Sequence, residues 1–462
     1  MVSAFWKDTY GGMTAFTAMI FSFMLLAFGM GVDFMRHETL RAELQNAVDR
    51  GLLAAAAHKQ TMDLETTLRS YIRSTNFVQD GYQLSVNQSS VNGLKKVTAT
   101  ASYDMSTYFL KLAGINTVAV VANGAAIEGV DTIELSLVLD VSTSMSYNTT
   151  GGSTDSRMDV LKTSAKQFVQ TLISNSPQDK LTINLVPFAG QVNPGSVAFN
   201  RLNSGVVHNY SNCVEFASSD FGSTTLPTSN SMAQMQYFNF SIPWNQKYGV
   251  TYSEIGWGWC PGGDEEEIIY HSSNVAQLQQ AIEDLNTHEA TGTQIGMKWG
   301  VSLLDPTSRD LTGDLVSSND VKTKFAGLPR NYSDKKNRKY LVIMTDGNTT
   351  QQLRVKPWYY DSSGERDYWA NNLSNNQAEH FLFNTTTTSS ARNQFLAVCQ
   401  AAKDAGIVVF TIGFDVAVGS AAHTDMSACA TSSSHFYDVD GLQLQSAFSS
   451  IVATIQKLKL VN

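Results

Sequence analysis

The sequence contains little charge for its length. Of its 462 residues, 16% are Asp, Glu, Lys or Arg and 43% are apolar, and the formal net charge is −9. This composition excludes an intrinsically disordered chain and allows two or three domains with a sizeable core. The acidic balance also argues against nucleic acid as the main partner. The chain has no internal repeat and no low-complexity tract.

Cysteine is equally scarce. The four cysteines contain no CxxC pair, which argues against a zinc knuckle. An even number in an exported domain suggests two disulfides, and the economical pairing is Cys213–Cys260 and Cys399–Cys429. Four buried free thiols would be favoured instead if the domain were cytosolic.

One segment has no charged residue at all, from Thr9 to Val32. Its core is long enough to cross the ~30 Å hydrocarbon layer as a single helix. A cleaved signal peptide is the competing interpretation, but the basic n-region is thin and no small-x-small cleavage site follows. We therefore predict an uncleaved anchor over residues 1–34, with residues 9–32 in the membrane and the long tail exported.

The chain between the anchor and residue 130 changes character twice. Over 35–75, an apolar residue recurs every four positions among charged ones, which predicts an amphipathic helix; the stripe consists of Leu40, Leu44, Val48 and Leu52. Its stripe could bundle with another helical subunit or pack on the chain's own downstream domain. Residues 76–130 are β-branched and partly alternating, which predicts a small β-rich region.

From residue 131 to 462, apolar strands alternate with amphipathic helices. The strands have no polar face, as expected for a parallel sheet covered on both sides. The pattern predicts an α/β domain with a doubly wound, mostly parallel sheet. Two stretches at about 192–285 and 351–390 are too long for plain connections, so we expect them to be insertions. Their aromatic residues could form a partner surface or small cores of their own.

Three groups of oxygen donors fall where ligands bind in such sheets, beyond the carboxyl ends of the strands. Asp140, Ser142 and Ser144 follow one strand in "LSLVLDVSTSMS", and Asp346 follows another in "VIMTDG". Thr291 and Thr293 precede a helix in "ATGTQIGM". A hard divalent cation such as Mg²⁺ prefers a few carboxylates, hydroxyls and water. Each element alone is weak, because Ser and Thr after a strand often cap a helix.

The DxSxS motif, the threonine loop and the TDG strand end, in this order, resemble the von Willebrand factor type A (vWA) domain over residues 131–458. The resemblance implies a metal-ion-dependent adhesion site for Mg²⁺, or Mn²⁺ or Ca²⁺. The implied ligands are Asp140, Ser142, Ser144, Thr291 and Asp346. Thr291 is preferred to Thr293 because the family's threonine stands five residues before a small residue, here Gly296.

The stretch "GVDFMRHETLRAELQNAVDRGLLAAA" resembles the N-terminus of TadE/TadG-like proteins of the bacterial Flp (Tad) pilus system. The C-terminal region ending in "LQLQSAFSSI" also resembles TadG-type chains. A prepilin would carry Glu five positions after its processing glycine, but Thr17 stands there after Gly12. The resemblances together imply a single-pass protein of the bacterial inner membrane, with its bulk in the periplasm or at the cell surface. Its metal site would bind a carboxylate of a protein partner, such as a pilus or Tad secretion component, in pilus biogenesis or adhesion.

Two other functions stay open at this point. A metal beside Asp140 could hydrolyse phosphate esters, although no second carboxylate follows at short spacing and the chain has no GxSxG elbow or P-loop. Alternatively, the protein could be a structural, pilin-like subunit that works through its N-terminal helix. We expect a non-enzymatic protein.

Overall fold

The computed structural model describes two compact units. Unit 1 comprises residues 1–129 and 456–462, and unit 2 comprises residues 130–455. The described residues are 11–56, 62–74, 81–91, 94–127, 132–150, 155–238, 259–261, 266–334, 336–371, 381–441, 443–456 and 460–461. Residues 9 and 10 of the expected membrane segment therefore lie outside them.

Unit 1 is built on one long helix, α2 (Gly11–Ala56). By length and composition, α2 is apolar enough to cross a membrane. Its first half exposes large apolar side chains such as Phe21 and Phe28, whereas its second half buries the stripe residues Leu44 and Leu52. The helix predicted over 35–75 is divided, because α2 ends at Ala56 and a second helix, α3 (Leu64–Arg73), follows.

The apolar stripe of α2 packs on a small sheet of its own unit. The antiparallel sheet has the order β1-β2-β3-β14, with β1 (Gln83–Val91), β2 (Leu94–Ser106), β3 (Thr117–Ile127) and β14 (Leu460–Val461). Leu44, Val48 and Leu52 share a core with Val97 and Val120 of this sheet. The stripe therefore packs on the chain's own β-rich region, which is one of the two partners that the sequence left open. The last residues also return to this sheet, so unit 2 ends before the predicted boundary at 462.

Unit 2 contains a six-stranded sheet in the order β13-β12-β9-β4-β5-β8. The strands are β4 (Thr132–Asp140), β5 (Leu181–Phe188), β8 (Ile269–Ser272), β9 (Asn337–Thr345), β12 (Val408–Phe414) and β13 (Phe436–Val439). All neighbouring pairs are parallel except β5–β8. The mostly parallel sheet predicted from the sequence is confirmed. Edge strand β8 was not predicted and lies within the stretch expected as the first insertion.

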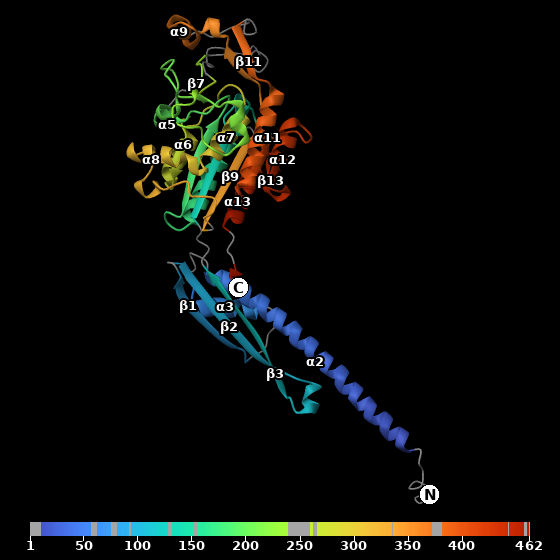
Figure 1. Cartoon of the computed structure of the whole chain (residues 1–462). Helices are drawn as coiled ribbons and strands as arrows, with labels where there is room; N and C mark the ends of the chain where they lie inside the picture. Colours follow the sequence, from blue (N-terminus) through green and yellow to red (C-terminus); the bar gives the residue numbers. More distant parts are fainter. Residues whose placement is uncertain are drawn as a thin grey trace, which may run out of the picture. The chain divides into compact units, whose positions relative to one another are not determined.

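Helices cover both faces of this sheet (Figure 1). One core contains side chains from α4 (Arg157–Ser174), α6 (Val275–Glu283) and α13 (Leu444–Ile455). The other contains side chains from α5 (Gly195–Leu202), α7 (Thr293–Ser302), α8 (Arg309–Ser317), α11 (Thr388–Asp404) and α12 (Ala421–Cys429). With apolar layers on both sides, a strand such as β5 is buried along its whole length.

The two insertions share one small core. They contain β6 (Val214–Glu215), β7 (Ala233–Gln234), β10 (Gln352–Val355), α9 (Ser363–Asn371) and β11 (Leu382–Thr386). Trp259 from the first insertion and Trp369 from the second are buried in the same cluster. Trp358 is 65% exposed, so the aromatic residues supply both a core and some surface. Residues 239–258, 262–265 and 372–380 of these stretches lie outside the described residues.

Both disulfides of the economical pairing are present. Cys213–Cys260 lies in the shared core of the insertions, and Cys399–Cys429 joins α11 to α12.

Candidate functional site

The chain reverses direction across the sheet between β4 and β9. From β4 it passes to β5 on one side, and it returns after β8 to place β9 on the other side of β4. Open α/β sheets bind ligands at such a switch point, outside the carboxyl ends of the strands. Asp140 ends β4, and Asp346 directly follows β9. The fold therefore places the two predicted carboxylates at the position where a ligand site is expected.

Asp140 is buried and held by two donors. The Ser142 backbone N–H donates to its Oδ1 at 2.7 Å, and the Thr345 hydroxyl donates to its Oδ2 at 2.5 Å. Its side chain is fully buried. Both donors belong to the motifs themselves, Ser142 to DxSxS and Thr345 to TDG, so the two motifs together fix the orientation of the carboxylate.

The two serines connect Asp140's loop to Asp346. Ser142 and Ser144 lie at the start of the short 3₁₀ turn η2 (Thr143–Ser146), and their hydroxyl oxygens are 3.0 Å apart. Ser144 Oγ donates to Asp346 Oδ1 at 2.7 Å. Four of the five predicted residues are therefore in one hydrogen-bonded cluster, which forms although the chain separates Ser144 from Asp346 by 202 residues.

The threonine loop, which contains Thr291 and Thr293, is hydrogen-bonded to the chain just after β4, β5 and β9. The His288 N–H donates to Val141 O after β4, and the Gly292 N–H donates to Ala189 O after β5. Thr350, after β9, donates its backbone N–H to Thr291 O at 2.9 Å. Its hydroxyl in turn accepts the Thr291 N–H at 3.0 Å. These bonds bring Thr291 to the same edge of the sheet as the carboxylates.

Thr293 stands beside it with a different environment. It is the first residue of α7, and its hydroxyl is buried without a hydrogen-bond partner in the described part of the chain. A buried hydroxyl without a partner is costly unless a ligand or water satisfies it. The structure therefore keeps Thr293 as the alternative to Thr291.

Sequence reasoning missed an ion-pair network at the same edge. Arg157, at the start of α4, donates from Nη1 to Asp346 Oδ2 at 2.7 Å and from Nε to Asp415 Oδ2 at 3.2 Å. Asp415 directly follows β12 and also accepts from the backbone N–H of Thr150 at 3.0 Å. Both carboxylates are fully buried, and the Arg157 side chain is 14% exposed. The rule that selected Asp140 and Asp346, a carboxylate after a strand, also selects Asp415.

The two central carboxylates repel each other. Burial, followed by the charge of Asp346, raises the pKa of Asp140 to about 7. Burial also raises the pKa of Asp346, while hydrogen bonds from Ser144 and Arg157 oppose this rise. Two buried carboxyls without enough positive charge favour binding a proton or a cation.

The donor set fits a hard divalent cation. It consists of carboxylate and hydroxyl oxygens, which Mg²⁺ prefers over nitrogen or sulfur ligands. The described residues contain no group of three or more His, Cys, Asp or Glu side chains that could hold a metal by themselves. A cation here would therefore depend on the serine and threonine hydroxyls and on water.

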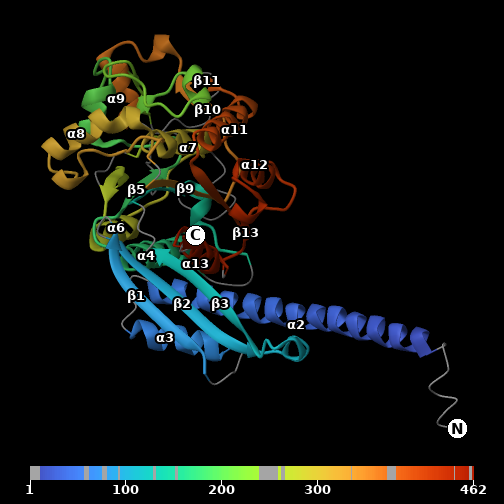
Figure 2. The same ribbon diagram turned by 60° about the horizontal axis from the view of Figure 1, so that its bottom comes forward.

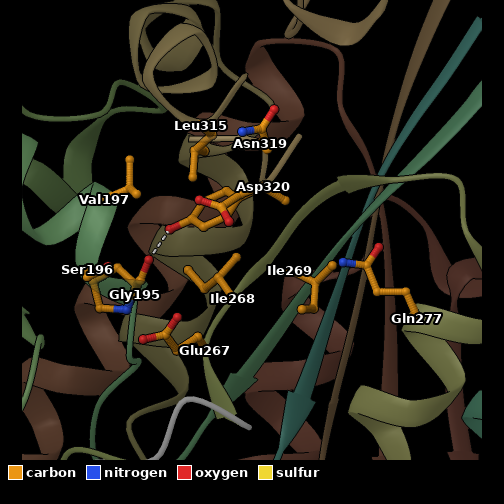
Figure 3. Close-up of a pocket in the computed structure, with 12 residues that line it drawn as sticks. Gly195, Ser196, Val197, Glu267, Ile268, Ile269, Gln277, Leu315, Asn319 and Asp320 are labelled. Carbon is orange, nitrogen blue, oxygen red and sulfur yellow. Dashed lines mark hydrogen bonds between the residues drawn. The ribbon is translucent and has the colours of Figure 1, made fainter. Parts of the chain in front are cut away.

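A separate pocket of about 260 Å³ lies in the same unit (Figure 3). It is formed by the start of α5, the residues of and before β8, and the end of α8. Glu267 and Asp320 contribute carboxylates, and the Tyr270 hydroxyl donates to Pro194 O at 2.6 Å. None of the five predicted ligands is among the described residues that line it.

Residues 11–58 match the family described as "Putative Flp pilus-assembly TadE/G-like". The N-terminal segment of this chain is TadE/G-like. The matched range nearly coincides with α2, so the TadE/G-like segment is the apolar helix together with its buried second half. No curated protein matches the sequence significantly.

Several solved structures are similar to the chain at low identity. The vWF domain of the type V pili tip protein Mfa5 from Porphyromonas gingivalis is 16% identical, with a TM-score of 0.36, covering 70% of this chain and 95% of that one. The pilus adhesin SpaC from Lactobacillus rhamnosus GG is 14% identical, with a TM-score of 0.36, covering 81% and 34%. The adhesive tip pilin GBS104 from Group B Streptococcus agalactiae is 10% identical, with a TM-score of 0.34, covering 70% and 99%. At these scores the similarities carry no argument about function.

Proposed function

We propose that this protein is a membrane-anchored pilus-assembly or adhesion factor of the Flp/Tad type, with a vWA domain that binds a partner through a divalent cation. The observation that carries the metal site is the convergence of Asp140, Ser142, Ser144 and Asp346 at the switch point of the sheet. The TadE/G-like segment supports the link to pili. The proposal includes no catalytic step.

The residues have distinct roles in this proposal. Asp140 and Asp346 supply negative charge, and Ser142 and Ser144 supply neutral oxygens beside them. Thr291 completes the set, with Thr293 as the alternative. When bound, Mg²⁺, or Mn²⁺ or Ca²⁺, supplies a Lewis-acid centre that a carboxylate of the partner can coordinate. Arg157 pairs with one oxygen of Asp346, so its positive charge competes with the cation for that carboxylate.

The anchor is the N-terminal part of α2. Its uncharged stretch from Gly11 to Val32 spans about 33 Å at 1.5 Å per residue, against about 30 Å of hydrocarbon. We place the protein in the bacterial inner membrane as a single-pass chain, with units 1 and 2 in the periplasm or at the cell surface. The partner is a pilus or Tad component that presents a carboxylate.

Binding to purified pili tests the metal-bridged mechanism. The full chain in nanodiscs is incubated with Flp pili in Mg²⁺ or in EDTA, beside Asp140→Asn and the surface control Asp404→Asn. We expect capture in Mg²⁺ by the native chain and by Asp404→Asn, and loss of capture in EDTA or with Asp140→Asn. Capture that persists in EDTA contradicts the metal-bridged mechanism and favours a structural role for the N-terminal helix.

A further inference from the structure

The hairpin between β2 and β3 ends in a compact tip, residues 107–116. Thr107 closes its base, donating its N–H to Asn116 O at 3.1 Å and its hydroxyl to Ile115 O at 2.5 Å. The tip contains the 3₁₀ turn η1 (Leu110–Ala113), which ends at Gly114 with φ of 83°. Both views show this tip beside α2, part-way along the helix (Figures 1 and 2).

Asp33 of α2 fastens the tip to the helix. Its carboxylate accepts the backbone N–H groups of Tyr108, Phe109 and Leu110 at 3.0, 2.8 and 2.9 Å. The Asp33 side chain is fully buried, with Arg36 at 3.5 Å. Three N–H donors converging on one oxygen pair satisfy a charge that burial would otherwise make costly.

One turn earlier, the tip lies directly on the helix backbone. A Cβ on Gly29 would be 2.3 Å from the Phe109 ring, so only glycine permits this approach. Gly29 belongs to the uncharged run, which ends at Val32. At 1.5 Å per residue, the contact lies about 4–5 Å inside the end of that run.

The surface at this level is apolar. On the tip, Tyr108 is 65% exposed, Leu112 is 75% exposed and Ile115 is 46% exposed. On α2, the residues just beyond Asp33 are also apolar and exposed, with Phe34 at 66% and Met35 at 72%. Because the tip covers Asp33, the apolar surface of the helix continues past the first charged residue and onto the hairpin.

Cations border this surface. The Arg36 guanidinium lies 4.0 Å from the centroid of the Tyr108 ring, and Lys111 is exposed on the tip. Tyrosine is enriched at membrane–water interfaces, and Lys and Arg extend from there to lipid headgroups. An apolar patch with a basic border is the surface expected of a segment in the headgroup region.

We infer that the tip, residues 107–116, inserts into the membrane interface beside α2 and forms a second contact between the protein and lipid. The inference rests on the proposed membrane anchor, with which the patch is continuous. It assigns to the buried Asp33 the role of holding the tip at the depth where α2 leaves the hydrocarbon.

Spin labelling of the full chain in phosphatidylethanolamine–phosphatidylglycerol nanodiscs tests this. The four native cysteines are paired, so one nitroxide can be placed at Leu112→Cys, at Phe21→Cys in the uncharged run, or at the exposed Ser89→Cys of β1. Power saturation then compares access by oxygen, which concentrates in lipid, with access by a water-soluble nickel chelate. We expect oxygen preference at positions 112 and 21 and nickel preference at 89.

Each other outcome has a definite meaning. Nickel preference at 112 with oxygen preference at 21 overturns the inference and leaves the anchor intact. Nickel preference at both positions refutes the anchor itself. Access by neither reagent at 112 shows that protein covers the tip, which also overturns the inference.

A second variant tests the role of Asp33. With the label at 112, Asp33→Ala should release the tip, so that oxygen preference is lost there while a label at 21 is unaffected. The matched control is Glu38→Ala, which removes a half-buried carboxylate from the same helix. An unchanged label at 112 in Asp33→Ala contradicts the assigned role.

Discussion

Replacing Asp140 by Asn should stabilise the metal-free protein at neutral and alkaline pH. The pKa of the buried Asp140 carboxyl is raised from 3.8 to about 7. A rise of about three units corresponds to about 4 kcal/mol, at 1.36 kcal/mol per unit. This is the order of the free energy that the folded state loses when the carboxyl is ionised without a cation. Asn keeps the shape, and its amide can donate to the Thr345 oxygen where the carboxylate accepted.

Proton linkage gives the direction in which the free energy of unfolding changes with pH. Between pH 4 and 7 the native state binds a proton at this pair that the unfolded state does not, so the free energy of unfolding rises as the pH falls. The destabilisation is full above about pH 7 and is relieved by about 3 kcal/mol at pH 5. Asp140→Asn removes this term, so its advantage over the native chain should be largest at pH 8 and small at pH 5.

Magnesium should narrow this difference in stability. A cation that binds only the folded state adds about 2.7 kcal/mol at a hundredfold excess over its Kd. The native chain should gain this at pH 8, and Asp140→Asn should gain none. If the two units unfold in separate transitions, only the transition of unit 2 should move in the variant.

The assay is thermal and urea unfolding of the full chain in nanodiscs, in EDTA and in Mg²⁺, at pH 5 to 8. The control is Asp404→Asn, which removes an exposed carboxylate of the same unit. A native chain in EDTA that is no more stable relative to Asp140→Asn at pH 5 than at pH 8 would contradict this prediction. Equal stabilisation of both chains by Mg²⁺ would contradict it as well.

Three further predictions concern unit 2. Arg157→Gln should tighten Mg²⁺ binding by about tenfold or more, measured by calorimetry, because the substitution removes a guanidinium that competes with the metal for Asp346. Weaker Mg²⁺ binding would show that Arg157 chiefly positions the carboxylate. Thr291→Ala should weaken Mg²⁺ binding more than Thr293→Ala, and the reverse order would move the ligand assignment to the buried hydroxyl of Thr293. Replacing Cys399 and Cys429 by Ser should lower the free energy of unfolding by about 3–4 kcal/mol for a 30-residue separation, measured in urea, whereas an unchanged value would refute a stabilising role.

The location of the candidate ligands at one edge of the sheet was largely predictable, because these residues follow a positional rule. Asp140 and Asp346 directly end or follow buried strands, and parallel strands end at the same edge. Asp415 obeys the same rule after β12 but stands outside the DxSxS and TDG motifs, so the motif-based prediction passed over it. Arg157 could not be predicted, because its contact to Asp346 spans 189 residues and depends on how α4 starts after a loop.

The fold was predictable where apolar runs were long. Edge strand β8 has four residues and an irregular register with β5, and the φ of His271 is 40°. Such a short, distorted strand has no alternating pattern to detect. Strand β14 has only two residues, Leu460 and Val461, and its pairing with β3 comes from tertiary closure and not from local sequence. The division of the predicted helix after Ala56 likewise depends on packing against the small sheet.

The charge balance at the sheet edge gives the metal hypothesis its physical basis. Asp140, Asp346 and Asp415 contribute three negative charges when ionised, and Arg157 contributes one positive charge, which leaves two negative charges. In the metal-free state, the Asp140 carboxyl can bind a proton because its pKa is raised, and this removes part of the excess negative charge. One divalent cation neutralises it completely, and it does so without protonation. Arg157 neutralises one of the two charges on Asp346 and Asp415, so one negative charge remains on that pair and one on Asp140. The neutral hydroxyls of Ser142 and Ser144 connect the loop of Asp140 to Asp346. The alternating oxygen donors of the sequence therefore lie at the place where this negative charge remains.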